Sequence, residues 1–94
     1  MHKRQLNRQQ YFNELSITSS RYFIPYISQY LELNEDVSVL EIGCGDGGNL
    51  LPFARKGCNT VGVDIAGVRI DDAITFFLKK LKLRESLLKQ IFLR

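Results

Sequence analysis

Four glycines are spaced so that they could hold a polar cofactor directly against the backbone. Gly43, Gly45, Gly47 and Gly48 lie within the stretch VLEIGCGDGGNL. Glycine adopts positive φ and lacks a Cβ, so a ligand can approach the chain closely at such a turn. Free N–H groups at the start of a following helix can then meet an anionic or polar group. The stretch therefore predicts a ligand-binding turn.

Two different motifs fit this turn. Gly43, Gly45 and Gly48 satisfy G-x-G-x-x-G, the dinucleotide fingerprint, which is weak evidence when it stands alone. Glu41, Gly43, Gly45 and Gly47 satisfy E-x-G-x-G-x-G. A carboxylate two residues before the first glycine is awkward beside a pyrophosphate. It suits a cationic cofactor such as S-adenosyl-L-methionine (SAM), and an NAD-type nucleotide-binding fragment stays as the alternative.

The elements around the turn are expected to form an α/β unit. VSVLEI (37–42) is nearly continuous in apolar character, which predicts a strand buried on both faces. NLLPFARK (49–56) predicts a short helix that Gly57 stops, and NTVGVDI (59–65) predicts a second strand. From Val68 an apolar stripe with helical spacing follows, and QIFLR (90–94) either continues a helix or begins a third strand. Strand, helix and strand in this order imply a parallel pair with a right-handed crossover.

The first 35 residues read as two helical segments. Ser19 or Ser20 is the expected N-cap of the second segment, where Pro25 is tolerable only near the first turn. We expect one partial domain, with a helical cap over residues 1–35 and the start of an α/β core over 36–94. The fold class is a partial Rossmann-like three-layer sandwich. Asp46 is expected to cap the helix after the glycine turn.

Asp64 ends the second predicted strand, 21 residues after Gly43. Ligands of open α/β sheets bind beyond the carboxyl ends of the strands, and parallel neighbours end at the same edge. Asp64 is therefore expected to face the same crevice as the glycine turn. A carboxylate at that place can accept hydrogen bonds from both hydroxyls of a ribose.

The segment VLEIGCGDGGNLLPFARKGCNTVGVDI resembles the cofactor-binding core of class I SAM-dependent methyltransferases. The resemblance implies that Glu41 orients the loop near the methionine end of SAM. It places Gly43, Cys44 and Gly45 under the cofactor and lets Gly47 turn the chain into the helix. It also implies that Asp64 holds the ribose hydroxyls.

The same resemblance gives Ile65 a place against the adenine. YFIPYI (22–27) resembles the helix that often precedes the core and helps to close over the cofactor, with Tyr22 or Tyr26 contributing. A structural interpretation of Glu41 stays open, in which its carboxylate only accepts hydrogen bonds that stabilise the loop and contacts no ligand.

The resemblance further implies strands and an acceptor pocket that these 94 residues do not contain. No residue is a candidate general base, so catalytic residues and the methyl acceptor stay unknown. A buried-type strand edge left unpaired is a liability. We therefore expect a fragment, a truncated remnant or interaction module without turnover, or a homo-oligomer that completes the sheet.

Composition and charge limit the classes of protein to which the chain can belong. Hydrophobic residues at 45% and charged residues at 24% are typical of a globular protein. No signal peptide or apolar span is evident, which favours a cytoplasmic protein with no membrane partner. The net charge of +3 divides into −1 up to Asp64 and +4 after it, where the lysines fall on the polar side of a helical pattern and do not support nucleic-acid binding. Two cysteines are too few and too distant for a zinc site or a disulfide framework, so no metal is expected.

Overall fold

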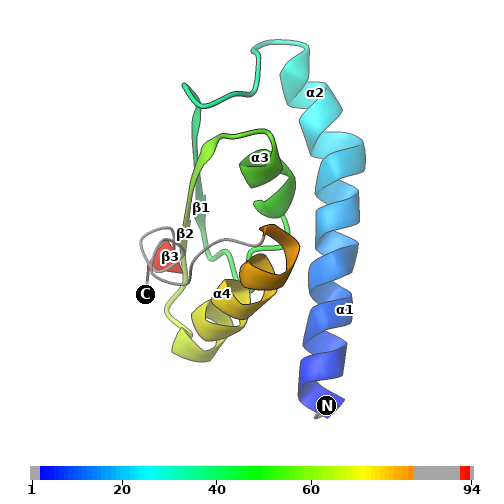
Figure 1. Cartoon of the computed structure of the whole chain (residues 1–94), viewed down its shortest axis with the longest axis vertical. Coiled ribbons are helices and arrows are strands. Elements are labelled where there is room, and N and C mark those ends of the chain that lie inside the picture. Colours follow the sequence, from blue (N-terminus) through cyan, green and yellow to red (C-terminus); the bar gives the residue numbers. More distant parts are fainter. Residues whose placement is uncertain (1–2, 82–91, 94) are drawn as a thin grey trace.

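The structure is a computed structural model, and it describes residues 3–81 and 92–93. The element order is α1 (Lys3–Thr18), η1 (Ser19–Phe23), α2 (Ile24–Ser28), β1 (Ser38–Ile42), α3 (Leu51–Arg55), β2 (Asn59–Val63), α4 (Gly67–Leu81) and β3 (Phe92–Leu93). Figure 1 shows the helices beside a small parallel sheet, with the long N-terminal helix on the outside. The predicted α/β class is confirmed.

The N-terminal segments form one continuous helical rod, which corrects the expected break at Ser19 or Ser20. Between α1 and α2 the rod widens into the π-turn η1, where the Ile24 N–H donates to the Ser19 carbonyl five residues back. Pro25 follows directly, at the start of α2. Proline removes one helical N–H and crowds the preceding turn, so an altered turn at this place is physically reasonable. Ser19 caps no helix, and its side chain is fully buried.

The sheet has the order β1-β2-β3, and both neighbouring pairs are parallel. In the register of β1 with β2, Leu40 lies opposite Val61 and Glu41 opposite Gly62. The third strand is confirmed at Phe92–Leu93, whereas the segment 82–91 before it lies outside the described residues. The crossover through α3 joins β1 to β2, and α4 leads from β2 to β3, as the parallel order requires.

The described helices pack on one face of the sheet. The main core joins Phe12 of α1 to Leu50 and Leu51 at the start of α3 and to the apolar stripe of α4. The Phe12 ring lies 5.0 Å from that of Phe76 and 6.0 Å from that of Phe77, centroid to centroid. The stripe predicted from helical spacing is confirmed at its buried members Ile70, Ala73, Ile74 and Phe77.

The other face of β1 is open within the described part of the chain. Leu40 is 62% exposed and Ile42 is 80% exposed, and exposure alternates along the strand. The expectation of a strand buried on both faces is therefore wrong for β1. The described helices supply one helical layer, and this is the partial form of the expected three-layer sandwich.

Candidate functional site

The carboxyl ends of β1 and β2 meet at the glycine turn. The N–H groups of Gly43 and Cys44 both donate to the Val63 carbonyl, at 2.6 and 3.0 Å. Gly43, Gly45 and Gly47 have φ values of 74°, 57° and 82°, which L side chains rarely adopt. The turn therefore continues from β1 in a path that needs glycine, and it is pinned to the end of β2.

Asp64 ties this turn to the next helix. Its Oδ2 accepts from the Gly45 N–H at 2.8 Å, and its Oδ1 accepts from the Ala66 N–H at 2.8 Å. These two hydrogen bonds, that from Ala66 first, lower the pKa of the Asp64 carboxyl. The carboxylate is thus ionised, and each oxygen keeps a further lone pair for a ligand donor.

Glu41 lies on the helix-covered face of β1, and one of its carboxylate oxygens lacks a partner. Oε2 accepts from the Asn49 side-chain amide at 3.2 Å, while Oε1 is buried without a hydrogen bond. Burial raises the pKa of Glu41, and the bond from Asn49 partly offsets that rise. A buried acceptor without a donor is unfavourable, so an additional donor or cation near Oε1 would stabilise this carboxylate.

Asp46 does not cap the following helix, which corrects the sequence-based expectation. The N-cap position of α3 is Leu50, without a side-chain cap. The Asp46 carboxylate is fully buried and pairs with Arg8 Nη2 at 2.6 Å and with Arg69 Nε at 3.5 Å. One arginine comes from α1 and the other from α4, so this ion-paired cluster fastens both helices to the glycine turn.

Two glycines serve different purposes here. A Cβ at Gly43 would meet nothing within 4 Å, so open space lies in front of this exposed residue. A Cβ at Gly48 would lie 2.6 Å from the Phe12 carbonyl oxygen and 2.8 Å from Leu15 Cβ. Gly43 therefore leaves room for a ligand, whereas Gly48 permits the close approach of α1.

The sequence model of a family described as "Methyltransferase domain" matches residues 8–90. The chain belongs to this methyltransferase domain family. The match includes β1, β2, the glycine turn and Arg8, and it confirms the resemblance to class I methyltransferases.

The methyltransferase domain also resembles a curated protein. It is 49% identical over 41 residues to "Sterol 4-C-methyltransferase strm-1" of Caenorhabditis elegans. That alignment covers 44% of this chain and 12% of the relative. No solved structure matches the chain.

The seven residues expected to bind cofactor lie at one end of the methyltransferase domain, but they differ in accessibility. Gly43 and Ile65 are exposed, and Ile65 is fully so. Glu41 and Asp64 are half-buried. Cys44, Gly45 and Gly47 are buried, and the Arg69 guanidinium lies against Gly45, where a Cβ would come within 2.8 Å of Nη2. Their roles toward a cofactor stay predictions.

The Cys44 thiol is an inert neighbour of the carboxylates. Burial, followed by the charges of Glu41, Asp64 and Asp46, raises its pKa to about 11. Thiolates rather than thiols are nucleophilic, so the buried side chain fills space at neutral pH. The described residues contain no group of three or more potential metal ligands.

Tyr22 and Tyr26 lie away from the glycine turn. Both are exposed, at 61% and 63%. Helix α2 packs through Ile24 against Phe53 and Cys58, near the amino ends of the strands. Figure 1 shows α2 at the top of the molecule and the segment between β1 and α3, which holds the glycine turn, near mid-height. The role of YFIPYI in closing over a cofactor stays a prediction. Helix α1 contacts the turn through Arg8 at Asp46 and through Phe12 and Leu15 at Gly48.

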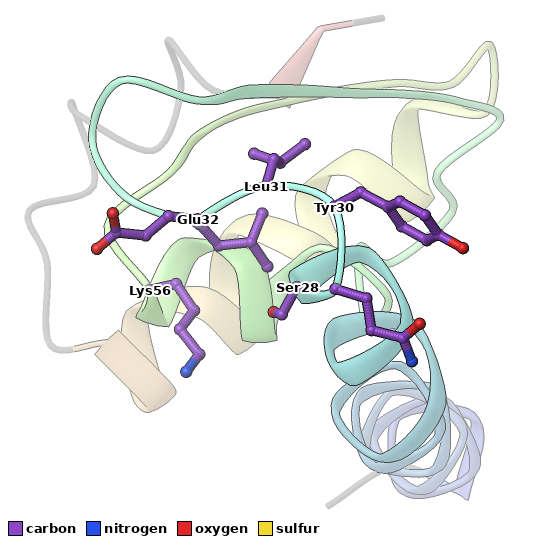
Figure 2. A pocket seen from close by; sticks show the side chains of 7 residues that line it. Ser28, Tyr30, Leu31, Glu32 and Lys56 are labelled. Carbon is purple, nitrogen blue, oxygen red and sulfur yellow. The ribbon is translucent and has the colours of Figure 1, made fainter.

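A hollow of about 550 Å³ also lies away from the glycine turn. Figure 2 shows its lining, which comes from the end of α2, the turn after it and the residue following α3. The lining residues are Ser28, Gln29, Tyr30, Leu31, Glu32, Leu33 and Lys56. This lining contains none of the residues that the sequence predicts to bind a cofactor.

Sequence reasoning did not find Arg8, Arg69 or Asn49. Arg8 and Asp46 are far apart in the sequence and meet only because α1 folds back on the turn. Arg69 could have been suspected from the sequence, because it lies in the first turn of α4, shortly after Asp64.

In the described part of the chain no helix is long and apolar enough to cross a membrane.

Proposed function

We propose that this domain binds SAM at the carboxyl ends of β1 and β2 and takes part in methyl transfer. The observation that carries the proposal is the Gly45–Asp64 hydrogen bond of 2.8 Å, which puts the glycine turn and the acidic strand end at one place. Parallel α/β sheets bind ligands there. Membership of the methyltransferase domain family supports the reaction class.

The residues present fit a cofactor that carries positive charge. The negative charges of three carboxylates, Glu41, Asp64 and Asp46, raise the pKa of the Cys44 thiol. The two arginines close to the turn, Arg8 and Arg69, both pair with Asp46. Glu41 keeps an unpartnered oxygen. A sulfonium or ammonium group is favoured by such a surplus of acceptors, whereas a pyrophosphate is not.

The remaining positions follow from exposure and from free acceptor capacity. Asp64 would accept hydrogen bonds from the ribose hydroxyls, and the exposed Ile65 would pack on the adenine. Gly43 leaves space for the ligand, with Cys44, Gly45 and Gly47 forming the turn beneath it. SAM supplies an activated methyl group, whose transfer depends on aligning it with the acceptor.

Calorimetric titration of the chain with SAM, S-adenosylhomocysteine and NAD tests the proposal. SAM and S-adenosylhomocysteine are expected to bind, and NAD is not. Binding of NAD alone would instead support the nucleotide-binding alternative. Absence of all binding would favour a non-catalytic remnant or interaction module of the same fold.

The methyl acceptor is not carried over from the sterol methyltransferase relative, because the shared segment is only 12% of that protein. The alignment covers only a small part of the relative. The proposal for this domain is therefore limited to binding the cofactor from which the methyl group is transferred.

We further propose that a second copy of the chain, or a further segment of a longer protein, completes the sheet beside β1. β1 is an edge strand of the described sheet, and its Leu40 and Ile42 also expose apolar side chains on the open face. Strand edges of natural proteins are usually covered or carry charge. Light scattering separates the alternatives: a dimer mass supports a second copy, and a stable monomer with cooperative unfolding contradicts the need for a cover.

A further inference from the structure

We propose that Asn49 is a positioning residue that fixes the Glu41 carboxylate beside the glycine turn and ties it to the π-turn of the N-terminal rod. The functional consequence rests on the proposed SAM site. The geometric part concerns three residues, Ser19, Asn49 and Glu41, from three separate segments of the chain.

The first contact joins the N-terminal rod to Asn49. Ser19 Oγ donates to the Asn49 carbonyl at 2.7 Å. Ser19 is fully buried and belongs to η1, where the helix widens. The contact uses the Asn49 main chain and is expected to survive replacement of the Asn49 side chain.

The second contact joins Asn49 to Glu41. Asn49 Nδ2 donates to Glu41 Oε2 at 3.2 Å, across the glycine turn that separates the two residues. This bond occupies one carboxylate oxygen and leaves Oε1 buried and unpartnered. Asn49 therefore fixes the orientation of the carboxylate and leaves Oε1 as the acceptor still to be satisfied.

The third observation is electrostatic. The carboxylate is partly desolvated, which raises the Glu41 pKa, and the Asn49 hydrogen bond is the influence that lowers it. The charges of Glu41, Asp64 and Asp46 all act on the Cys44 thiol, and Asp46 is paired with Arg8 of α1 and Arg69 of α4. Thus Asn49 favours the ionised form that a cationic ligand needs.

The test measures Glu41 directly in the full chain. The carboxyl carbon of Glu41 is followed by NMR through a pH titration in wild type, Asn49→Ala and Asn49→Asp. The Glu41 midpoint is expected above 4.5 in wild type, higher in Asn49→Ala, and highest in Asn49→Asp, which adds a like charge. An unchanged midpoint in both variants would overturn the proposal.

A matched control and a second variant guard this result. Asn59→Ala removes another asparagine donor, to the Glu35 carbonyl at 3.0 Å, at the amino end of β2. It is expected to leave the Glu41 midpoint unchanged. If Asn49→Ala fails to fold, Asn49→Ser keeps a short donor, and its midpoint is expected between those of wild type and Asn49→Asp. A midpoint equal to wild type in Asn49→Ser and in Asn49→Asp counts against the proposal.

SAM affinity tests the functional consequence of the Asn49–Glu41 contact. Asn49→Ala is expected to weaken SAM binding about tenfold near the Glu41 midpoint, and less at a pH two units higher, because the carboxylate is then ionised in both proteins. An equal loss at both pH values would show that Asn49 does not act through Glu41. If the wild type binds no SAM, the cofactor proposal fails, whereas the NMR titration still decides the role of Asn49.

Discussion

The Gly45 N–H donates to Asp64 Oδ2 at 2.8 Å, so the residue predicted to bind ribose also holds the glycine turn in shape. The same carboxylate accepts from Ala66 at the start of the connection to α4. One side chain therefore joins the carboxyl ends of both strands. Loss of Asp64 is expected to disturb the turn as well as the ligand.

Asp64→Asn tests this double role through pH. The folded-state pKa of Asp64 lies below its ordinary value of 3.8, so the carboxylate contributes stability that is present above pH 3.8 and lost as pH falls through the folded-state pKa. Thermal unfolding is expected to show a lower Tm for Asp64→Asn at pH 7. The gap to wild type should narrow below pH 3.8. A gap that does not change with pH would contradict an electrostatic contribution.

Glu41→Gln is expected to separate stability from binding. The Glu41 pKa is raised above 4.5, so the ionised carboxylate opposes folding as pH rises through the folded-state pKa. Glutamine removes that charge and should raise Tm at pH 7 while weakening SAM binding about tenfold or more. Calorimetry and thermal unfolding of the same preparation check both effects. A lower Tm together with unchanged affinity would show that Glu41 is only a loop-stabilising acceptor.

Alanine at Gly48 and at Gly43 is expected to act in opposite ways. Gly48→Ala puts a Cβ 2.6 Å from the Phe12 carbonyl oxygen, a backbone atom, and should destabilise the fold by about 2 kcal/mol. Gly43→Ala meets no atom within 4 Å, and its φ of 74° costs about 1 kcal/mol. Denaturant unfolding measures both. Gly43→Ala, but not Gly48→Ala, should lose SAM affinity by more than its loss of folded protein explains.

The ion-paired cluster gives a stability prediction that does not depend on a ligand. Asp46→Asn leaves Arg8 and Arg69 without their buried anion and should lower the free energy of unfolding by about 2 kcal/mol. Asp36→Asn, at an exposed position, is the control and should stay within about 0.5 kcal/mol of wild type. Equal stability of both variants would show that the cluster does not fasten the helices to the turn.

The local part of this fold follows from sequence, and the long-range part does not. The α4 stripe is visible because apolar residues recur at helical spacing, and β1 and β2 are visible as short runs of β-branched and apolar residues. The meeting of Asp64 with the glycine turn follows from parallel pairing, since neighbouring strands end together. Those rules concern elements rather than individual distant side chains.

The contacts made by the N-terminal rod, which comprises α1, η1 and α2, cannot be predicted from hydrophobic spacing or from strand pairing. The burial of Asp46 by Arg8 depends on how α1 lies across the turn, and sequence spacing does not encode that placement. A serine before an apolar run predicts an N-cap, yet Ser19 reaches the Asn49 carbonyl from inside a continuous helix. The long-range partner prevailed over the local preference. For β1, apolar residues on both faces predicted full burial, but Leu40 and Ile42 lie on the open face of the described sheet.

The most direct measurement of the central claim is an amide NMR titration of the full chain with SAM. The SAM site is expected to produce shifts at Gly43, Asp64 and Ile65, at the carboxyl ends of the strands, and none at Tyr30 or Lys56 around the distant hollow. Shifts confined to the hollow, or no shifts at saturating SAM, would contradict the proposed site.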